Sequence, residues 1–220
     1  MSCKEFIFKG DDKLEYIAND NTFNEIYKTL EDPWNQTDEN DTYYKRSRKI
    51  VSLTVEHFLK CDKEINILEI GCGNGFSTYD LKNKINRKNI NYYGCDISDI
   101  AIEKAKKYKD IKFFTHDIKK PFKKDIKYDF IIISNLLWYI LEYLEISLKN
   151  SFDVLNEEGK IVFYSAFVRD QRYGNHIISG FEDMKNFLIE KFPDKKILKE
   201  INEYNKNKEY YRYLVLFVLN

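Results

Sequence analysis

The sequence predicts an α/β domain in which helices cover both faces of a mostly parallel sheet. Short β-branched segments alternate with segments of helical periodicity, a glycine-rich turn follows the first of these strands, and two strand-like segments close the chain. The 220 residues, 43% of them hydrophobic and 33% charged, have the composition of a globular protein and suffice for one domain.

Residues 1–63 are predicted to form a helical cap within the same domain as the core, residues 64–220. Apolar side chains recur at helical spacing from Phe23 to Leu30, and Asp32-Pro33 ends this first helix. A second helix is predicted from about Tyr43 to Leu59, because apolar residues again fall on one face.

The core is predicted to alternate between strands and helices, which is typical of parallel sheets. The predicted strands are residues 65–70, 91–95, 111–115, 128–134 and 161–166. The predicted helices are residues 76–85, 99–108, 139–155 and 182–192. Residues 196–204 and 210–219, separated by a short polar loop, predict a closing hairpin and therefore an antiparallel strand at one edge.

A ligand site is expected where the first two core strands end. Gly71, Gly73 and Gly75 follow the first strand, where they permit a tight turn and a close approach of a ligand to the backbone. Asp96 ends the next strand, roughly twenty residues later, where a carboxylate can bind the hydroxyls of a ribose. These two segments fit a dinucleotide or an adenosyl cofactor.

The spacing of the glycines separates these two possibilities. They form G-x-G-x-G, whereas the dinucleotide-binding fingerprint is G-x-G-x-x-G, with a pyrophosphate at the helix N-terminus. Glu69, just before the turn, would repel a phosphate and suit a cationic amino group. The pattern therefore favours an adenosyl cofactor.

Five ordered motifs between about residues 43 and 166 resemble those of class I S-adenosylmethionine-dependent methyltransferases. They are Ile67–Gly75, Tyr93–Ser98, Thr115–Ile118, Tyr128–Asn135 and Leu155–Val162. The resemblance implies a Rossmann-like seven-stranded sheet with the strand order 3-2-1-4-5-7-6 and an antiparallel strand 7, which agrees with the predicted hairpin. It also implies S-adenosylmethionine as the cofactor.

The same resemblance assigns roles to individual residues. Glu69, Gly71 and Gly73 would flank the methionine part of the cofactor, Asp96 would bind its ribose, and Asp117 would meet its adenine. Arg48 could reach the cofactor carboxylate. The predicted cofactor-binding residues are Tyr44, Arg48, Glu69, Gly71, Cys72, Gly73, Asp96, Ile97, Asp117, Ile118 and Asn135.

The methyl acceptor is expected between the cap and the loop after the fourth core strand. Aromatic side chains often line such pockets, so Trp34, Tyr43, Trp138 and Tyr139 are the predicted substrate-binding residues. Tyr139 is also assigned to catalysis, together with His176 as the general base, because an amine or hydroxyl acceptor can need one.

A shorter resemblance concerns the acceptor itself. Asp32-Pro33-Trp34 and the paired aromatic residues Trp138-Tyr139 are similar to segments of the nodulation sugar N-methyltransferases. This implies an acceptor that is an amine or hydroxyl of a small molecule, such as a sugar, a nucleotide-linked sugar or a precursor of glycan modification.

Charge and motifs argue against several other partners. Lys and Arg number 36, as do Asp and Glu, so no net charge attracts nucleic acid or an anionic membrane. Residues 135–138 read Asn-Leu-Leu-Trp and differ from the Asn-Pro-Pro-Tyr of nucleic-acid amino methyltransferases. Since no cluster of carboxylates resembles a magnesium site, no metal is expected. A monomer or homodimer is compatible with the sequence.

The expected compartment is the cytoplasm. Cys3, Cys61, Cys72 and Cys95 are widely spaced and predict reduced thiols, and neither a signal peptide nor a long apolar segment is evident. Two other functions are weighed against methyl transfer. An NAD-dependent oxidoreductase conflicts with the glycine spacing, and a catalytically silent binding subunit would not need acidic residues at three successive strand ends.

Overall fold

The computed structural model describes residues 3–19, 21–38, 42–59, 63–168, 171–204 and 212–220. Seven strands form one sheet in the order β5-β4-β3-β6-β7-β9-β8. Their bounds are β3 Ile65–Ile70, β4 Ile90–Asp96, β5 Ile111–Thr115, β6 Tyr128–Ser134, β7 Leu155–Val168, β8 Ile197–Tyr204 and β9 Arg212–Leu219. Only β9 runs antiparallel to its neighbours, β7 and β8. The predicted fold class and strand order are confirmed.

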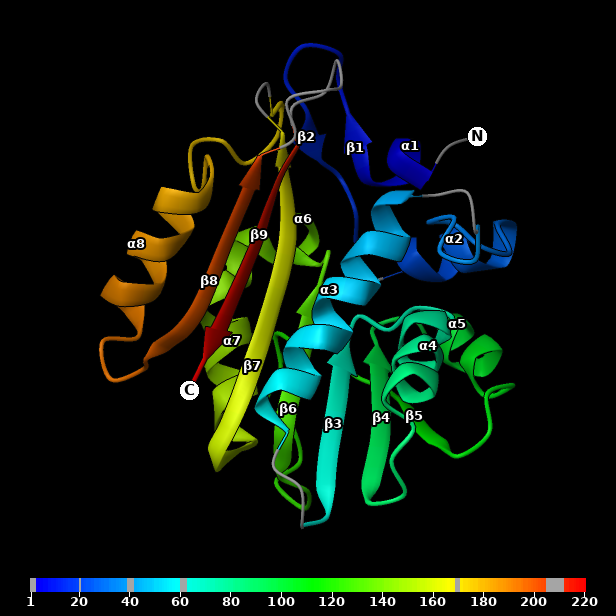
Figure 1. The fold of residues 1–220 in the computed structure, drawn as a ribbon. Coiled ribbons are helices and arrows are strands. Elements are labelled where there is room, and N and C mark those ends of the chain that lie inside the picture. Colours follow the sequence, from blue (N-terminus) through cyan, green and yellow to red (C-terminus); the bar gives the residue numbers. More distant parts are fainter. Residues whose placement is uncertain (1–2, 20, 39–41, 60–62, 169–170, 205–211) are drawn as a thin grey trace.

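Helices pack on both faces of this sheet (Figure 1). One face carries α3 (Thr42–Phe58) and α4 (Phe76–Ile85), with α5 (Asp99–Ala105) beside them. The other carries α6 (Leu137–Ile140), α7 (Leu144–Asp153) and α8 (Phe181–Lys191). Each face buries its own apolar cluster, because the strands are apolar on both sides. None of the described helices is long and apolar enough to cross a membrane.

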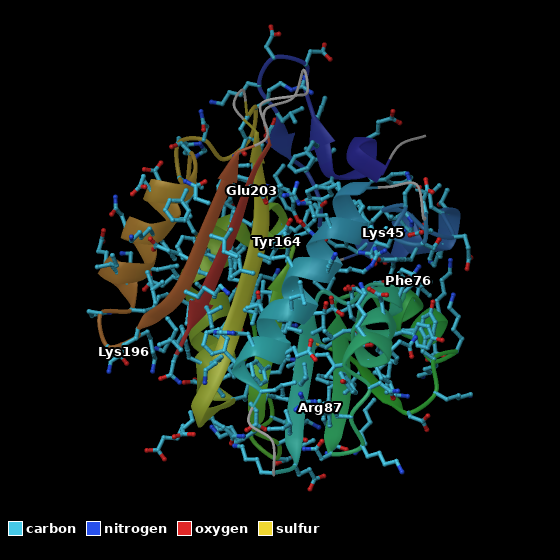
Figure 2. All side chains as sticks on the ribbon, viewed as in Figure 1. Lys45, Phe76, Arg87, Tyr164, Lys196 and Glu203 are labelled. Carbon is cyan, nitrogen blue, oxygen red and sulfur yellow. The ribbon has the colours of Figure 1, made fainter. Side chains whose placement is uncertain are left out.

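Helix α3 reaches across the sheet toward its far edge. Its Arg46 pairs with Glu203 of β8, which lies near Tyr164 of β7 in Figure 2. Val51 and Val55, on the next turns of α3, are buried against the same face. The helix therefore links the N-terminal segment to the sheet, as its apolar periodicity predicts.

The remaining N-terminal elements lie over the carboxyl ends of the parallel strands (Figure 1). They are α1 (Cys3–Ile7), the antiparallel pair β1 (Phe8–Lys9) and β2 (Glu15–Tyr16), and α2 (Thr22–Thr29). The sequence predicts α2 but not the short hairpin. Each strand of that hairpin has only two residues, too few for an alternation of apolar and polar side chains to be recognised in the sequence.

Two core predictions were wrong in detail. The helix predicted over residues 139–155 is divided into α6, the 3-10 turn η1 (Leu141–Tyr143) and α7. The buried residues Leu137, Ile140, Leu141 and Leu144 keep helical spacing through the break, so periodicity conceals it. Strand β7 begins at Leu155 rather than residue 161, because an irregularity in its pairing with β6 replaces the turn predicted at Gly159.

One further difference concerns the end of a helix. Helix α5 ends at Ala105, three residues before the predicted end at Tyr108. The predicted loop at 205–208, the first two residues of the last predicted strand and Cys61 lie outside the described residues.

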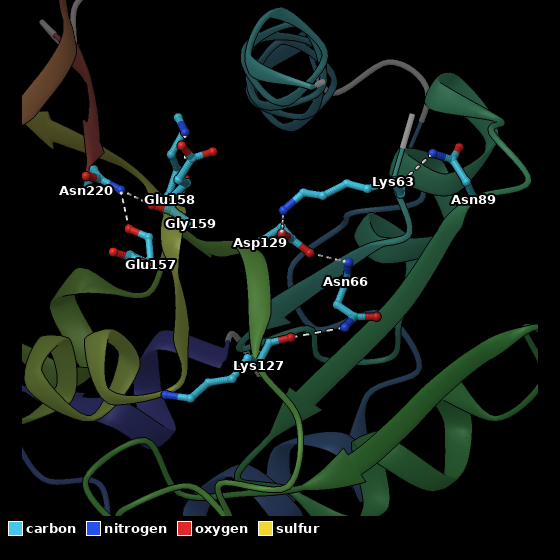
Figure 3. Close-up of polar contacts among 10 residues, drawn as sticks. Lys63, Asn66, Asn89, Lys127, Asp129, Glu157, Glu158, Gly159 and Asn220 are labelled. Atoms are coloured by element: carbon cyan, nitrogen blue, oxygen red, sulfur yellow. Dashed lines mark hydrogen bonds and ion pairs between the residues drawn. The ribbon is translucent and has the colours of Figure 1, made fainter. Parts of the chain in front are cut away.

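A polar network fixes the amino-terminal ends of the two central strands (Figure 3). Asp129, at the start of β6, accepts the main-chain N–H of Asn66 at 2.9 Å and Nζ of Lys63 at 2.8 Å. Asn66 in turn donates its side-chain amide to the carbonyl of Lys127 at 3.0 Å. The register between β3 and β6 is thus held at the end opposite the N-terminal elements.

Candidate functional site

A cavity of about 400 Å³ lies at the carboxyl ends of β3, β4, β5 and β6, beneath the N-terminal elements. This is where ligands bind in open α/β sheets, and the volume falls in the range of small-molecule sites. Nine of the predicted site residues line it: Trp34, Tyr44, Gly71, Asp96, Ile97, Asp117, Ile118, Asn135 and Tyr139.

The glycine turn after β3 is held by hydrogen bonds to the end of β4. Gly71 donates its N–H to the carbonyl of Cys95 at 2.8 Å, and Gly73 donates to Oδ2 of Asp96 at 2.9 Å. Both glycines have positive φ angles, +76° and +53°, which other residues adopt only with strain. Of this turn, Gly71 lines the cavity, whereas Gly73 is covered by Tyr27.

Asp96 is nearly buried at the end of β4, with 8% of its surface exposed. Its second oxygen, Oδ1, accepts the N–H of Ser98 at 3.0 Å, and Ser98 caps α5 through a bond from the N–H of Ala101. Burial raises the pKa of Asp96, and the hydrogen bonds from Ser98 and Gly73 oppose this shift. The carboxylate keeps lone pairs that could accept further donors from a ligand in the cavity.

The segment after β5 forms the next part of the wall. Asp117 accepts the N–H of Lys119 at 3.0 Å, and the carbonyl of Ile118 is held by the side chain of Asn150 at 2.8 Å. His116 also lines the cavity, with its ring 3.8 Å from that of Phe122, and burial lowers its pKa. An acidic side chain, Asp117, and an aromatic ring, His116, are thus adjacent in this wall.

Asn135 follows β6 in a left-handed conformation, with φ of +57°. Its N–H donates to the carbonyl of Tyr164 at 2.8 Å, and its side-chain oxygen accepts the hydroxyl of Tyr43. Asparagine tolerates this conformation better than most residues. Tyr43 does not line the cavity itself; it fixes a residue that does.

An aromatic cluster of Phe23, Tyr27, Trp34 and Tyr139 lines the side of the cavity toward α2. Nε1 of Trp34 donates to the hydroxyl of Tyr27 at 2.9 Å, and the ring of Tyr139 lies 5.5 Å from Trp34 and 5.8 Å from Phe23. Burial raises the pKa of Tyr27 well above its usual range, so its hydroxyl stays protonated. Phe23 and Tyr27 therefore belong to the site as well. The sequence predicted them only as residues of the cap helix.

Glu69 and Arg48 lie on the other side of the sheet from the cavity. Side chains alternate along a strand, so Ile70 faces the cavity while Glu69 faces α3 and α4. Oε2 of Glu69 accepts the hydroxyl of Thr78 at 2.5 Å, and burial raises the pKa of Glu69. Arg48 donates to Asp80 at 3.1 Å. Neither side chain therefore lines the cavity, and their cofactor contacts remain predictions.

Other predicted residues also lie outside the cavity lining. Trp138 donates to the carbonyl of Ala166 at 3.1 Å and packs on Phe167, as a core residue would. His176 is exposed on the segment between β7 and α8. Cys72 is buried in the glycine turn, and Gly73 beside it is covered by Tyr27. Among the described residues, no group of three His, Cys, Asp or Glu side chains could hold a metal ion.

This fold and cavity define a Rossmann-like domain that binds a nucleoside-containing cofactor. Residues 61–214 match the family model described as "Methyltransferase domain", and the chain belongs to this family. It is a class I S-adenosylmethionine-dependent methyltransferase, and S-adenosylmethionine is its cofactor. The alternative of an NAD-dependent oxidoreductase, which the glycine spacing already disfavoured, is therefore set aside.

Two curated relatives are O-methyltransferases. The chain is 31% identical over 111 residues to a malonyl-[acyl-carrier protein] O-methyltransferase of Bacillus anthracis, covering 50% of this chain and 40% of the relative. A second such enzyme, from Ilyobacter polytropus, is 29% identical over 161 residues, covering 61% and 58%. The chain thus spans about half the length of the curated relatives it matches.

Solved structures share the fold at lower identity. The CurJ carbon methyltransferase has a TM-score of 0.69 at 20% identity, covering 91% of this chain and 61% of that one. The N-methyltransferase NodS of Bradyrhizobium japonicum, in complex with S-adenosyl-L-homocysteine, has a TM-score of 0.65 at 20% identity, covering 90% and 98%. These similarities concern the fold alone.

Proposed function

We propose that this protein transfers the methyl group of S-adenosylmethionine to an amine or hydroxyl of a small molecule. The observation that carries the proposal is the cavity in which Gly71, Asp96, Asp117 and Asn135 meet at the ends of four strands. We place the methionine part of the cofactor at Gly71 of the glycine turn. Asp96 offers acceptors for ribose hydroxyls, and Asp117 offers one for the adenine amino group.

Bound S-adenosylmethionine supplies a methyl group on a good, neutral leaving group. The residues of the chain then mainly have to align an acceptor and exclude water, and alignment alone contributes greatly to such a reaction. At the side of the cavity toward α2, the acceptor is aligned and water is excluded by Phe23, Tyr27, Trp34 and Tyr139. Aromatic ring faces attract cations, including a sulfonium or an amine acceptor. We assign Trp34 and Tyr139 to the acceptor.

The acceptor class is the finer part of the proposal. A sugar amine or a nucleotide-linked sugar is suggested by the segments similar to nodulation N-methyltransferases, whereas the curated relatives methylate a malonyl group on a carrier protein. The cavity of about 400 Å³ has room for one cofactor-sized ligand, so only the reacting end of a larger acceptor would enter.

The remaining assignments also belong to the proposal. We place the protein in the cytoplasm, since Cys72 and Cys95 are free thiols, and we expect it to act on a small molecule without a metal or nucleic acid. It would do so as a monomer or homodimer. His176 stays a predicted general base without a contact to the cavity; His176→Ala should abolish turnover and preserve cofactor binding if that role is real.

Two measurements test the proposed function. Calorimetric titration should give saturable binding of S-adenosylhomocysteine at one site and none of NAD. Release of S-adenosylhomocysteine from S-adenosylmethionine should then rise with one member of a panel of amino sugars, nucleotide sugars, simple amines and malonyl-carrier protein. Tight binding of NAD, or of neither ligand, would refute the proposal. Cofactor binding without turnover on any acceptor would favour a silent binding subunit.

A further inference from the structure

The cavity is lined by more negative than positive side chains. Among the described residues of the lining, three carry carboxylates: Asp96, Asp117 and Glu142. In the same set, the ammonium group is that of Lys119, whose Nζ lies 3.8 Å from Oδ2 of Asp117. The positive charge is thus already placed beside one carboxylate. The excess negative charge of the lining favours a ligand that brings positive charge.

Glu142 is the carboxylate that the proposed cofactor contacts leave over, since Asp96 is assigned to the ribose and Asp117 to the adenine. Its side chain is exposed, and no described residue forms an ion pair or hydrogen bond with it. Tyr143, the next residue of η1, also lines the cavity and is 48% exposed. Both side chains reach solvent as well as the cavity, so they lie at its opening.

Glu142 lies close to residues that we assign to the acceptor. Tyr139 precedes it by three residues, in α6, and helical residues at this spacing share a face. Tyr16 of β2 lines the same cavity, and its ring stacks on that of Tyr173 at 5.9 Å. Burial and, to a smaller extent, the charge of Glu142 raise the pKa of Tyr173 to about 12. The carboxylate is therefore near the N-terminal hairpin as well as the acceptor side.

A carboxylate among aromatic rings suits a cation, which it pairs with while the ring faces attract it. The Tyr143 ring already has an ammonium group over it, because Nζ of Lys119 lies 5.1 Å from its centre. We infer that Glu142 binds a positively charged ammonium group of the methyl acceptor at the opening of the cavity. This rests on the proposed function, whose two acceptor classes, amines and hydroxyl compounds, it narrows to cationic amines.

The charge of Glu142 disfavours the other acceptor classes. A neutral alcohol gains no charge attraction from the carboxylate. A malonyl thioester brings a carboxylate of its own, which Glu142 would repel. No arginine lies in the described part of the lining, and Lys119 is beside Asp117. The acceptor would therefore differ in charge from the malonyl group named for the curated relatives.

The test uses three probes of similar size that differ in charge: benzylamine, benzyl alcohol and benzoate. Each is titrated at neutral pH and low salt into the protein loaded with S-adenosylhomocysteine. Benzylamine should bind about three- to ten-fold more tightly than benzyl alcohol, because exposed ion pairs and contacts of cations with ring faces are each modest in strength. Benzoate should bind most weakly.

Two substitutions of Glu142 change this order in different ways. Glu142→Gln should reduce the affinity for benzylamine to that for benzyl alcohol. Glu142→Lys should reverse the order, so that benzoate binds best, which a merely structural role of Glu142 would not produce. Glu145→Gln is the matched control, because Glu145 lies in α7, 3.7 Å from Nζ of Lys191, and is not part of the cavity lining. All three variants should bind S-adenosylhomocysteine like the unchanged protein.

The outcomes separate this inference from the proposed function. Equal affinity for benzylamine and benzyl alcohol in the unchanged protein would overturn the inference. A preference for benzylamine that persists in Glu142→Gln, or that Glu145→Gln also abolishes, would overturn it as well. Failure of the unchanged protein to bind S-adenosylhomocysteine would instead refute the proposed function, and with it the methyl acceptor as the source of the ammonium group, whatever the probes show.

Discussion

The main-chain N–H of Gly73 donates a 2.9 Å hydrogen bond to the carboxylate of Asp96, so the glycine turn and the end of β4 form one unit. The same carboxylate accepts the N–H of Ser98, which begins the segment toward α5. Asp96 therefore shapes the floor of the cavity and also faces it. A residue proposed to bind the ribose thus has a structural role that does not depend on a ligand.

Replacing Gly73 with alanine should damage both stability and binding. A β-carbon at Gly73 would lie 2.4 Å from the hydroxyl oxygen of Tyr27, and the φ of +53° is itself unfavourable for alanine by about 1–2 kcal/mol. We expect a melting temperature lower by several degrees and at least ten-fold weaker binding of S-adenosylhomocysteine. Gly180→Ala is the control, because no atom lies within 4 Å of the added carbon there. Equal effects of both substitutions would contradict the account.

Cofactor binding should weaken in mild acid. Burial raises the pKa of Asp96 above its ordinary value of 3.8, so protonation begins at higher pH than for an exposed aspartate. Ribose hydroxyls need the deprotonated carboxylate, and affinity for S-adenosylhomocysteine should fall as pH drops through the raised pKa. This pH dependence can be checked by titrating S-adenosylhomocysteine into the unchanged protein and into Asp96→Asn at a series of pH values from neutral to mildly acidic. The Asn variant should bind weakly at every pH, and an equally steep pH dependence in it would argue against Asp96.

The Asp96 carboxyl should affect stability in the opposite direction: it should make the ligand-free protein less stable as pH rises. Between the ordinary and the raised pKa, the folded protein binds more protons at Asp96 than the unfolded chain does. The contribution of Asp96 to the free energy of unfolding therefore falls as pH rises across this window. Denaturant unfolding of the ligand-free protein should show this component, and Asp96→Asn should remove it. A contribution that grows with pH would show that the carboxylate is stabilised rather than penalised by its surroundings.

Arg48 should act through Gln36 rather than on the cofactor directly. Lysine cannot donate to Gln36 and Asp80 at once or stack on Phe76, so Arg48→Lys should weaken S-adenosylhomocysteine binding several-fold. Arg46→Lys, in an exposed ion pair with Glu203, is the matched control. A loss of binding in Arg48→Lys no larger than in Arg46→Lys would contradict this role of Arg48.

The network at the amino-terminal ends of the strands should affect stability alone. Asp129→Ala leaves the N–H of Asn66 without its partner, which costs about 1–3 kcal/mol. Lys63→Ala removes only a pair whose lysine is 54% exposed, and we expect less than about 1 kcal/mol. Denaturant unfolding and calorimetry would show both effects, with binding of S-adenosylhomocysteine unchanged. A loss of binding in Asp129→Ala would mean that the two ends of the sheet are coupled.

Local sequence was sufficient to predict the strands and much of the cavity wall. Gly71, Asp96, Asp117 and Asn135 each lie at the end of a strand or within two residues of it, so finding the strands also locates these residues at one edge of the sheet. Their positions at the cavity could therefore be predicted, whereas their roles toward a ligand remain proposals. Periodicity could not reveal the break at Leu141, where apolar spacing continues through the 3-10 turn.

The cap side of the site could not be predicted from the sequence. Tyr27 has the spacing of a core residue, and only the packing of α2 over the glycine turn brings its hydroxyl to Gly73. Gln36 belongs to no motif, and the main-chain hydrogen bonds to Asp32 and Arg48 that hold it in the cavity lining cannot be recognised in the sequence. Trp138 shows the opposite error, since an aromatic residue next to the predicted pocket packs into the core.

A crystal structure of the protein with S-adenosylhomocysteine tests the central claim most directly. The account predicts the ligand in the cavity beneath α2, with its ribose hydroxyls on the carboxylate of Asp96 and its adenine beside Asp117. A ligand bound elsewhere, or one whose ribose makes no contact with Asp96, would contradict it.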